Sequence, residues 1–158
     1  MIKVAIGQDS HRFDFNDPIK KLVLGGVIFD GPPLSGNSDA DVVLHALANA
    51  ISGITGVNIL GGIADRMCFE EGITDSSYYV KEALKYFNGT ISHVSFSIEC
   101  LKPKISPNIP VMKKSIANIL NISEDNIGIT ATTGEGLTDF GKGLGIQCFC
   151  IITAIQKP

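Results

Sequence analysis

Strand-like and helix-like hydrophobic patterns alternate along this chain, and the alternation limits the folds that are open to it. Alternating or β-branched apolar residues predict strands at 2–8, 21–29, 93–101, 127–132 and 143–155. Apolar residues spaced three and four apart predict helices at 38–53, 75–87 and 107–120. Such interleaving is typical of an α+β fold, a mixed β-sheet with helices on one face. At 158 residues the chain has the length of a single domain, 1–158.

Two parts of this outline leave alternatives open. The strands predicted at 2–8 and 21–29 can pair with each other through the polar stretch 14–20. No element is assigned between Gly61 and Asp75, and disorder before a substrate binds is one alternative for this segment.

Charge and hydropathy exclude two classes of partner. The formal net charge is -3, and Lys and Arg are scattered along the chain, so we expect no nucleic acid to bind. No apolar run approaches the roughly 18 residues of a membrane span, so we expect no membrane contact. The segment Met1–Ile6 leads directly into a predicted strand without a visible export signal, and we expect a cytoplasmic protein.

The four cysteines lack metal-site spacing. Cys68, Cys100, Cys148 and Cys150 contain no C-x-x-C pair and lie among apolar residues, so we expect reduced packing residues. The alternative is a thiolate metal site at Cys148 and Cys150, which lacks a further soft ligand nearby.

The first predicted helix begins with a capping signal. Ser38 is the expected N-cap with Asp41 at N3, a capping-box arrangement that uses Asp in place of Glu or Gln. Asp41 also precedes His45 by four residues, so both lie on one helical face, where the carboxylate can orient the imidazole.

Three residues are candidates for a metal site. Asp9 and His11 are two apart at a strand end, so their side chains leave the same face about 6 to 7 Å apart. With His45 they provide three ligands and leave a fourth tetrahedral position open, as in catalytic zinc sites. The alternative is structural: Asp9 caps a turn, His11 lies on the surface and His45 is a satisfied core histidine.

The loop 130–136 combines hydroxyls, glycines and one carboxylate directly after a predicted strand. Its hydroxyls and backbone amides can bind phosphate oxygens, while Glu135 can hold a Mg²⁺ ion that bridges two phosphates. An ordinary strand-to-loop exit is the alternative. Lys104 is either a phosphate contact or part of a solvated basic edge, and His93 is expected to be a packed or surface residue without a role.

Several motifs in register resemble one enzyme family. They are Gly7-Gln8-Asp9-Ser10-His11-Arg12-Phe13, Ser38-Asp39-Ala40-Asp41-Val42-Val43-Leu44-His45-Ala46, Pro103-Lys104 and Ala131-Thr132-Thr133-Gly134-Glu135-Gly136-Leu137. Their order and spacing resemble the 2-C-methyl-D-erythritol 2,4-cyclodiphosphate synthase family almost from end to end.

The resemblance implies a homotrimer of single α+β domains with active sites between neighbouring protomers. It implies an enzyme of nonmevalonate isoprenoid biosynthesis, a metal-dependent phosphorus-oxygen lyase. The substrate is 4-diphosphocytidyl-2-C-methyl-D-erythritol 2-phosphate, a CDP-linked sugar-alcohol phosphate. Its 2-phosphate attacks the β-phosphorus of its own diphosphate and expels CMP, which leaves a cyclic diphosphate.

The resemblance also implies roles for individual residues. Asp9, His11 and His45 resemble zinc ligands, and Glu135 resembles the ligand of a Mg²⁺ or Mn²⁺ ion that bridges two substrate phosphates. The resemblance implies that Thr133, and the residue at the position of Asn37, stabilise the transition state. The implied substrate contacts are Ser38, Gly62, Ile63, Ala64, Cys100, Lys104, Ile105, Ser106, Thr132 and Lys142.

The chain departs from the family pattern on the sugar side. Asn37 stands in place of a histidine, and an amide cannot become a cation near neutral pH. Asn49 and Gly62 replace acids, and Lys142 and Leu144 replace an arginine and a glutamate near the trimer axis. A Phe-Pro-Asp-Thr-Asp stretch is absent. A diverged relative that acts on another nucleotide-linked phosphate, or a non-catalytic trimer that binds metal or nucleotide, therefore remains as an alternative.

Overall fold

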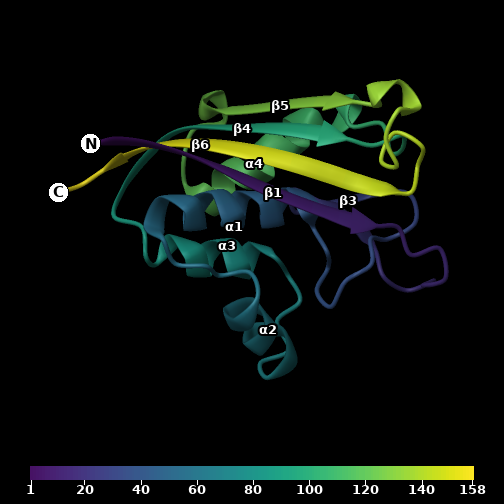
Figure 1. Cartoon of the computed structure of the whole chain (residues 1–158), viewed down its shortest axis with the longest axis horizontal. Coiled ribbons are helices and arrows are strands. Elements are labelled where there is room, and N and C mark those ends of the chain that lie inside the picture. Colours follow the sequence, from purple (N-terminus) through teal and green to yellow (C-terminus); the bar gives the residue numbers. More distant parts are fainter.

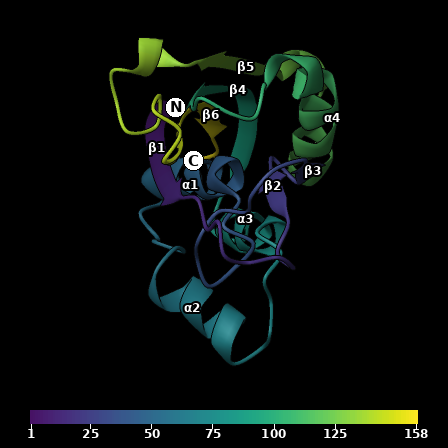
Figure 2. The same cartoon turned by 90° about the vertical axis from the view of Figure 1, so that its right-hand side faces the viewer.

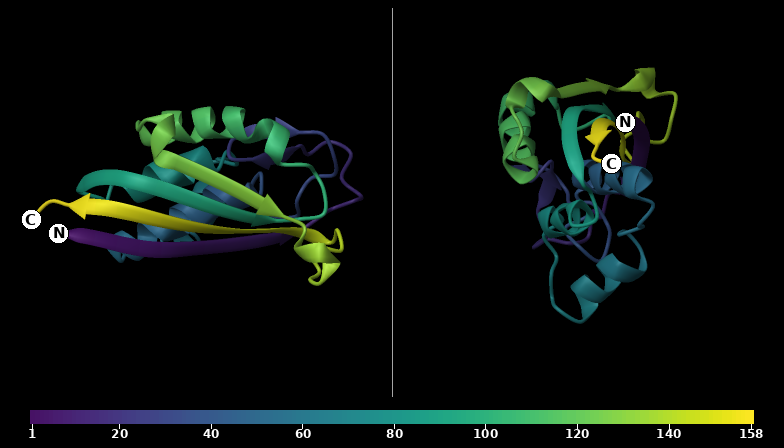
Figure 3. Two further views of the ribbon diagram at one scale, coloured as in Figure 1. Left: turned by 90° about the horizontal axis from the view of Figure 1, so that it is seen from above. Right: turned by 90° about the vertical axis from the view of Figure 1, so that its left-hand side faces the viewer.

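The computed structural model describes residues 1–158 and contains one mixed four-stranded sheet along its length. The strand order is β1-β6-β4-β5, with antiparallel β1/β6 and β6/β4 pairs and a parallel β4/β5 pair. Figure 1 and the left view in Figure 3 show the strands along the length of the molecule, with both termini at one end. The bounds are β1 Ile2–Arg12, β4 Gly89–Glu99, β5 Ile127–Thr132 and β6 Gly145–Gln156.

The predicted pairing of the first two strand segments is wrong. β1 pairs with β6 along its whole length, from Ile2 opposite Ile155 to Arg12 opposite Gly145. The segment 21–29 instead forms a separate hairpin of β2 (Leu22–Leu24) and β3 (Val27–Phe29). Gly25 and Gly26 connect the two strands with φ values of 63° and 77°, as a tight two-residue hairpin turn requires.

All the long helices cover one face of the sheet, as predicted. α1 packs on β1 and β6, α4 packs beside β5, and α3 lies under α1. Figure 2 and the right view of Figure 3 show the sheet above α1 and α3, with α2 farthest from it. The bounds are α1 Val42–Thr55, α2 Gly62–Phe69, α3 Ser77–Leu84 and α4 Ile109–Leu120, with short 3-10 turns at Ser106–Asn108, Glu124–Asn126 and Gly134–Gly136.

The segment 61–75 is folded in this structure, which disfavours the alternative of disorder. Most of it forms α2, an additional helix that the sequence pattern did not predict. Only Ala64 of this helix is buried, so its apolar periodicity is weak.

α1 lies unusually close to β1 because β1 carries a glycine at their contact. A Cβ atom at Gly7 would lie 2.0 Å from the carbonyl oxygen of Ala46. The absence of a side chain therefore lets the helix backbone approach the strand. His45 directly precedes Ala46, the residue at this contact.

The opposite face of the sheet is open and carries apolar side chains. Ile2, Val4 and Ile6 of β1 are 72%, 65% and 61% exposed. Ile151 and Ile155 of β6 lie opposite Ile6 and Ile2 and are also exposed. Isolated apolar residues on a surface are ordinary, but a contiguous group on one sheet face is typical of an interface.

No helix in the structure combines the length and apolar character needed to span a membrane. All four cysteines are free; Cys100, Cys148 and Cys150 are buried as predicted, whereas Cys68 on α2 is half-buried.

Candidate metal centre

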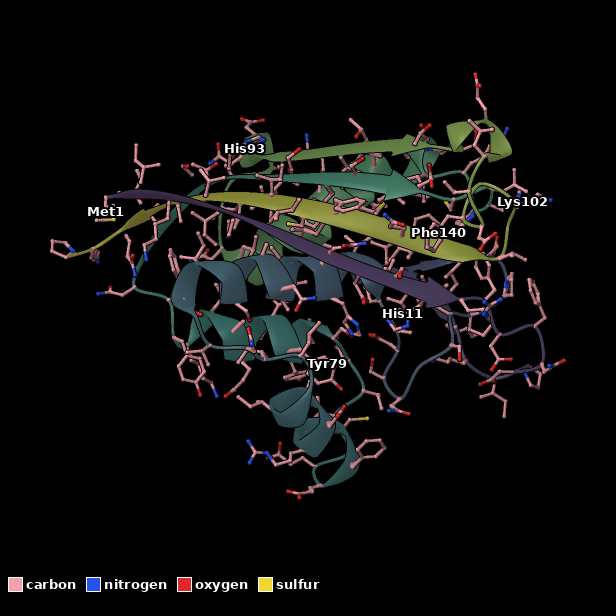
Figure 4. All side chains as sticks on the ribbon, viewed as in Figure 1. Met1, His11, Tyr79, His93, Lys102 and Phe140 are labelled. Carbon is pink, nitrogen blue, oxygen red and sulfur yellow. The ribbon has the colours of Figure 1, made fainter.

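The end of β1 presents two of the three predicted ligands. Asp9 and His11 alternate with exposed residues, so both side chains point toward the helical layer. Nε2 of His11 lies 2.8 Å from Oδ2 of Asp9. Figure 4 shows His11 near the end of β1, on the side that faces the helices.

α1 brings the third residue to the same point. The His45 side chain is nearly buried, and its Nδ1 lies 3.1 Å from Oδ2 of Asp9 and 3.4 Å from Nε2 of His11. The ligand atoms of all three residues lie within 4.8 Å of one another. The structure therefore brings together the three residues that the sequence analysis predicted.

The site favours a charged carboxylate next to imidazoles. Burial opposes the ionised form of Asp9, but hydrogen bonds and charges from His11 and His45 outweigh it and lower the pKa of Asp9 to about 2. Burial also opposes a charge on His11, yet the hydrogen bond and charge of Asp9 raise its pKa above 6.5.

The arrangement fits a tetrahedral metal ion. Nδ1 of His11 lies 2.8 Å from the carbonyl oxygen of Ser35. A carbonyl oxygen only accepts, so Nδ1 carries the proton, and in the neutral ring the lone pair of Nε2 is then available to a metal ion. Ligands 2.0–2.1 Å from a tetrahedral zinc ion are about 3.3 Å apart, close to the spacings seen among these atoms. Asp9, His11 and His45 could therefore hold a metal and leave one position open.

The predicted capping role of Ser38 and the predicted orienting role of Asp41 are wrong. Asp41, not Ser38, is the N-cap of α1, and its carboxylate accepts hydrogen bonds from the backbone N–H groups of Val43 and Leu44. The same carboxylate accepts from Gly25 and Gly26 in the β2–β3 turn. These four donors occupy the carboxylate, so Asp41 anchors the hairpin to α1 and does not orient His45.

A cleft of about 280 Å³ opens beside the three ligands. Asn37, Ser38 and Ala64, three of the residues with a predicted role in catalysis or substrate binding, line it. Gly62 and Ile63 do not line it; Ile63 lines a separate cleft between α2 and α3.

Sequence reasoning missed two residues of α2 that line the cleft, Asp65 and Cys68. With Gly61 and Ala64 they follow the spacing i, i+3, i+4, i+7 of one helical face. That spacing could have identified them, had the segment been interpreted as a helix.

The predicted nucleotide and phosphate residues gather elsewhere on the chain. A cleft of about 310 Å³ is lined by Cys100, Lys104, Ile105, Ser106, Thr132 and Thr133. Lys142 lines a neighbouring cleft that also contains Lys104. Glu135 is exposed just after Thr133, with a left-handed φ of 57°. None of these residues lines the cleft beside Asp9, so one chain presents two separate groups of predicted site residues.

Comparison with known proteins agrees with this geometry. The model of the YgbB family matches residues 2–155, which is nearly the whole chain. This chain belongs to the YgbB family. The chain is also similar to the 2-C-methyl-D-erythritol 2,4-cyclodiphosphate synthase of Chlamydia felis, which is 51% identical over 157 residues, 98% of this chain and 89% of the relative. The synthase of Chlamydia trachomatis serovar D is 48% identical over 98% of this chain and 88% of its own length.

Solved structures share the fold of this family member. IspF of Plasmodium falciparum in a CDP complex matches with a TM-score of 0.81 and 29% identity, over 99% of this chain and 97% of that one. The bifunctional IspDF of Campylobacter jejuni matches with a TM-score of 0.88 and 25% identity, over 99% of this chain and 43% of that one. The family resemblance inferred from the motifs is confirmed.

Proposed function

We propose that this YgbB family member converts 4-diphosphocytidyl-2-C-methyl-D-erythritol 2-phosphate into 2-C-methyl-D-erythritol 2,4-cyclodiphosphate and CMP, in nonmevalonate isoprenoid biosynthesis. One observation carries the proposal: Asp9, His11 and His45 converge in a chain about half identical to relatives that bear this synthase's name. The chain would act as a metal-dependent phosphorus-oxygen lyase.

The reaction forms one phosphorus-oxygen bond and breaks another. An oxygen of the 2-phosphate attacks the β-phosphorus, and the bond from that phosphorus to the bridging oxygen breaks, so that CMP leaves with the electron pair. Little covalent chemistry is asked of the protein, and positioning with charge neutralisation supplies most of the catalysis.

Asp9, His11 and His45 would hold zinc, which would act as a Lewis acid on a phosphate oxygen. Asn37 and Ser38 lie in the same cleft and can donate hydrogen bonds to phosphate oxygens. Ala64 offers only apolar contact on the sugar side.

The second group of residues would bind the nucleotide end. The hydroxyls of Thr132 and Thr133 and the ammonium of Lys104 line one cleft and suit phosphate oxygens. Cys100, Ile105 and Ser106 complete the walls, where a cytosine base would lie. Glu135 would provide one carboxylate ligand to a Mg²⁺ or Mn²⁺ ion shared with the diphosphate, since such an ion favours one or two carboxylates plus phosphate.

We further propose that the enzyme is a homotrimer in the cytoplasm. The open sheet face carries exposed isoleucines on both β1 and β6, which a partner chain would cover. The two groups of site residues lie in separate clefts of one chain, as expected where one protomer completes the site of the next. Four free thiols are typical of a reducing compartment.

Phosphorus NMR of the purified, zinc-loaded protein with Mg²⁺ and the proposed substrate tests this function. Equal amounts of CMP and the cyclic diphosphate are the expected products. CDP-linked alcohols that lack the 2-phosphate are the matched controls and should remain intact. Turnover of another CDP-linked phosphate but not of this substrate would favour a diverged relative, as the changed sugar-side residues Asn37 and Gly62 suggest. Bound nucleotide without any product would favour a non-catalytic trimer.

A further inference from the structure

Both ring nitrogens of His45 have partners, and the partner of Nε2 was not expected. Nδ1 faces Asp9 and His11, while Nε2 lies 2.8 Å from the hydroxyl oxygen of Ser76. A neutral imidazole carries one N–H, so Nδ1 can serve as a metal ligand only if the proton is on Nε2. The groups that keep the proton on Nε2 of His45 are therefore part of the metal site.

Ser76 is fully buried and does not perform the usual task of a serine in its position. It is the N-cap residue of α3, but its side chain makes no capping hydrogen bond. Its hydroxyl instead lies between Nε2 of His45 and a carboxylate oxygen of Asp39. The carboxylate of Asp75 accepts from the backbone N–H of Ser77 in its place, so the hydroxyl of Ser76 is free for another contact.

Asp39 determines the direction of these hydrogen bonds. Its carboxylate accepts from the backbone N–H groups of Ser76 and Asp41, each at 3.0 Å, and from the hydroxyl of Ser76. Because an ionised carboxylate only accepts, the single hydroxyl proton of Ser76 points to Asp39. The hydroxyl oxygen must then accept from Nε2–H of His45.

The other nearby polar groups are poorer partners for Nε2. The hydroxyl of Ser38 is farther from Nε2, at 3.4 Å, and already accepts from the backbone N–H of Ala40. The carboxylate of Asp41 is occupied by four backbone donors.

We propose that Asp39 and Ser76 are positioning residues, which hold His45 as the Nε2–H tautomer and so present the lone pair of Nδ1 to the metal. The inference rests on the metal site of the proposed function and adds two residues to it. Hydrogen-bonded partners of this kind fix both the tautomer and the ring orientation of a histidine ligand, and their loss commonly costs 10- to 100-fold in metal affinity.

The first test measures the wild-type protein and uses variants only to assign its signals. The chain has only three histidines, so nitrogen NMR of histidine-labelled, metal-free protein can be assigned with His11→Ala and His93→Ala. At a pH where the imidazoles are neutral, we expect the shifts of His45 to report the Nε2–H tautomer, because the hydroxyl of Ser76 lies 2.8 Å from Nε2 whereas the competing acceptor Asp9 lies 3.1 Å from Nδ1. A dominant Nδ1–H tautomer would overturn the proposal, whatever reaction the chain catalyses.

The second test compares zinc affinity by chelator competition in the full-length protein. Ser76→Ala and Asp39→Ala should each weaken zinc binding about 10- to 100-fold and mix the tautomers of His45. Ser77→Ala is the matched control, since Ser77 is the next residue along α3 and makes no contact with His45; its affinity should equal that of the wild type. Ser76→Ala with unchanged zinc affinity and only a lower melting temperature would reduce Ser76 to a structural residue.

These readouts separate the inference from the proposed function. Tautomer and zinc affinity are measured without substrate, so they stand even where the phosphorus NMR assay finds no cyclic product. Conversely, a wild type that makes the product while His45 is Nδ1–H would retain the function and contradict the inference.

Discussion

A single carboxylate oxygen organises the candidate metal centre. Oδ2 of Asp9 lies within 3.1 Å of both imidazoles, and the side chain of Asp9 is 22% exposed. Across these contacts the carboxylate and the imidazoles each stabilise the charged form of the other. The shifted pKa values of Asp9 and His11 follow from this exchange.

The two shifts predict a bell-shaped pH dependence for the stability of the metal-free protein. The pKa of Asp9 is lowered from 3.8 to about 2, so its contribution is present above 3.8 and is lost as the pH falls toward 2. The pKa of His11 is raised from 6.5, so its contribution is present below 6.5 and is lost as the pH rises through the raised value. We expect the largest contribution, about 2 kcal/mol from Asp9, between these limits.

Urea unfolding of the chelator-treated protein across this pH range provides the measurement. Asp9→Asn keeps the size of the side chain but removes its charge, so the free energy of unfolding should depend less on pH in this variant. An identical pH profile in the wild type and Asp9→Asn would show that the carboxylate does not interact with charged histidine.

The residue scale also shows what the sequence could predict about the site. Asp9, His11 and His45 could be identified because strand and helix periodicity fix which side chains share a face. The partner of His45 could not, because Ser76 lies 31 positions away and reaches it only through the packing of α3 on α1. Asp41 has the spacing along α1 that would let it contact His45, but its carboxylate accepts hydrogen bonds from the β2–β3 turn instead.

At the scale of elements, the contact of β1 with α1 determines whether the ligands meet. Asp9 and His11 belong to the strand, and His45 belongs to the helix. Their separation therefore depends on the distance between the two backbones, which Gly7 keeps short.

Gly7→Ala should separate the ligands. Its Cβ would meet the Ala46 carbonyl oxygen at 2.0 Å, so α1 must move away from β1, at a cost of about 3 kcal/mol in the free energy of unfolding. As α1 moves away, the amount of zinc bound by the folded protein should fall. Gly128→Ala is the control, because its Cβ would meet only side-chain atoms 3.7 Å or more away. Full zinc binding by Gly7→Ala would contradict the role of this close approach.

Elements with a strong period were predicted, and those set by tertiary contacts were not. The apolar spacing in 42–55 identified α1, and alternation identified β4 and β6. α2 was missed because only Ala64 is buried and glycines flank the helix. The partner of β1 was wrong because β6 begins more than 130 residues later, and local pattern carries no information on such a pairing.

On the scale of the whole molecule, the open sheet face exposes apolar side chains that a single chain does not cover. Its exposed isoleucines come from both β1 and β6 and lie in cross-strand register. A trimer would bury this face and bring the second group of site residues of one chain to the metal centre of another.

Ile6→Glu should disrupt that assembly. A carboxylate buried without a partner is costly, so we expect smaller species in analytical ultracentrifugation and loss of turnover. Zinc binding should persist, because all three ligands belong to one chain. Ile28→Glu is the control: Ile28 is 67% exposed, but it lies on the β2–β3 hairpin away from the open face. A fully active trimer of Ile6→Glu would contradict the assignment of this face.

The most direct test of the account measures bound zinc and cyclic diphosphate together, in the wild type, His45→Ala and His93→Ala. His93 is exposed on β4 and lies outside the group of three ligands, so it is the matched control for zinc binding. We predict that the wild type binds zinc and forms the cycle, and that His93→Ala binds as much zinc as the wild type. His45→Ala should lose most of its zinc and about 1,000-fold or more of its rate, while its circular dichroism stays native. Wild-type turnover by His45→Ala would contradict the central claim that this metal centre performs the cyclisation.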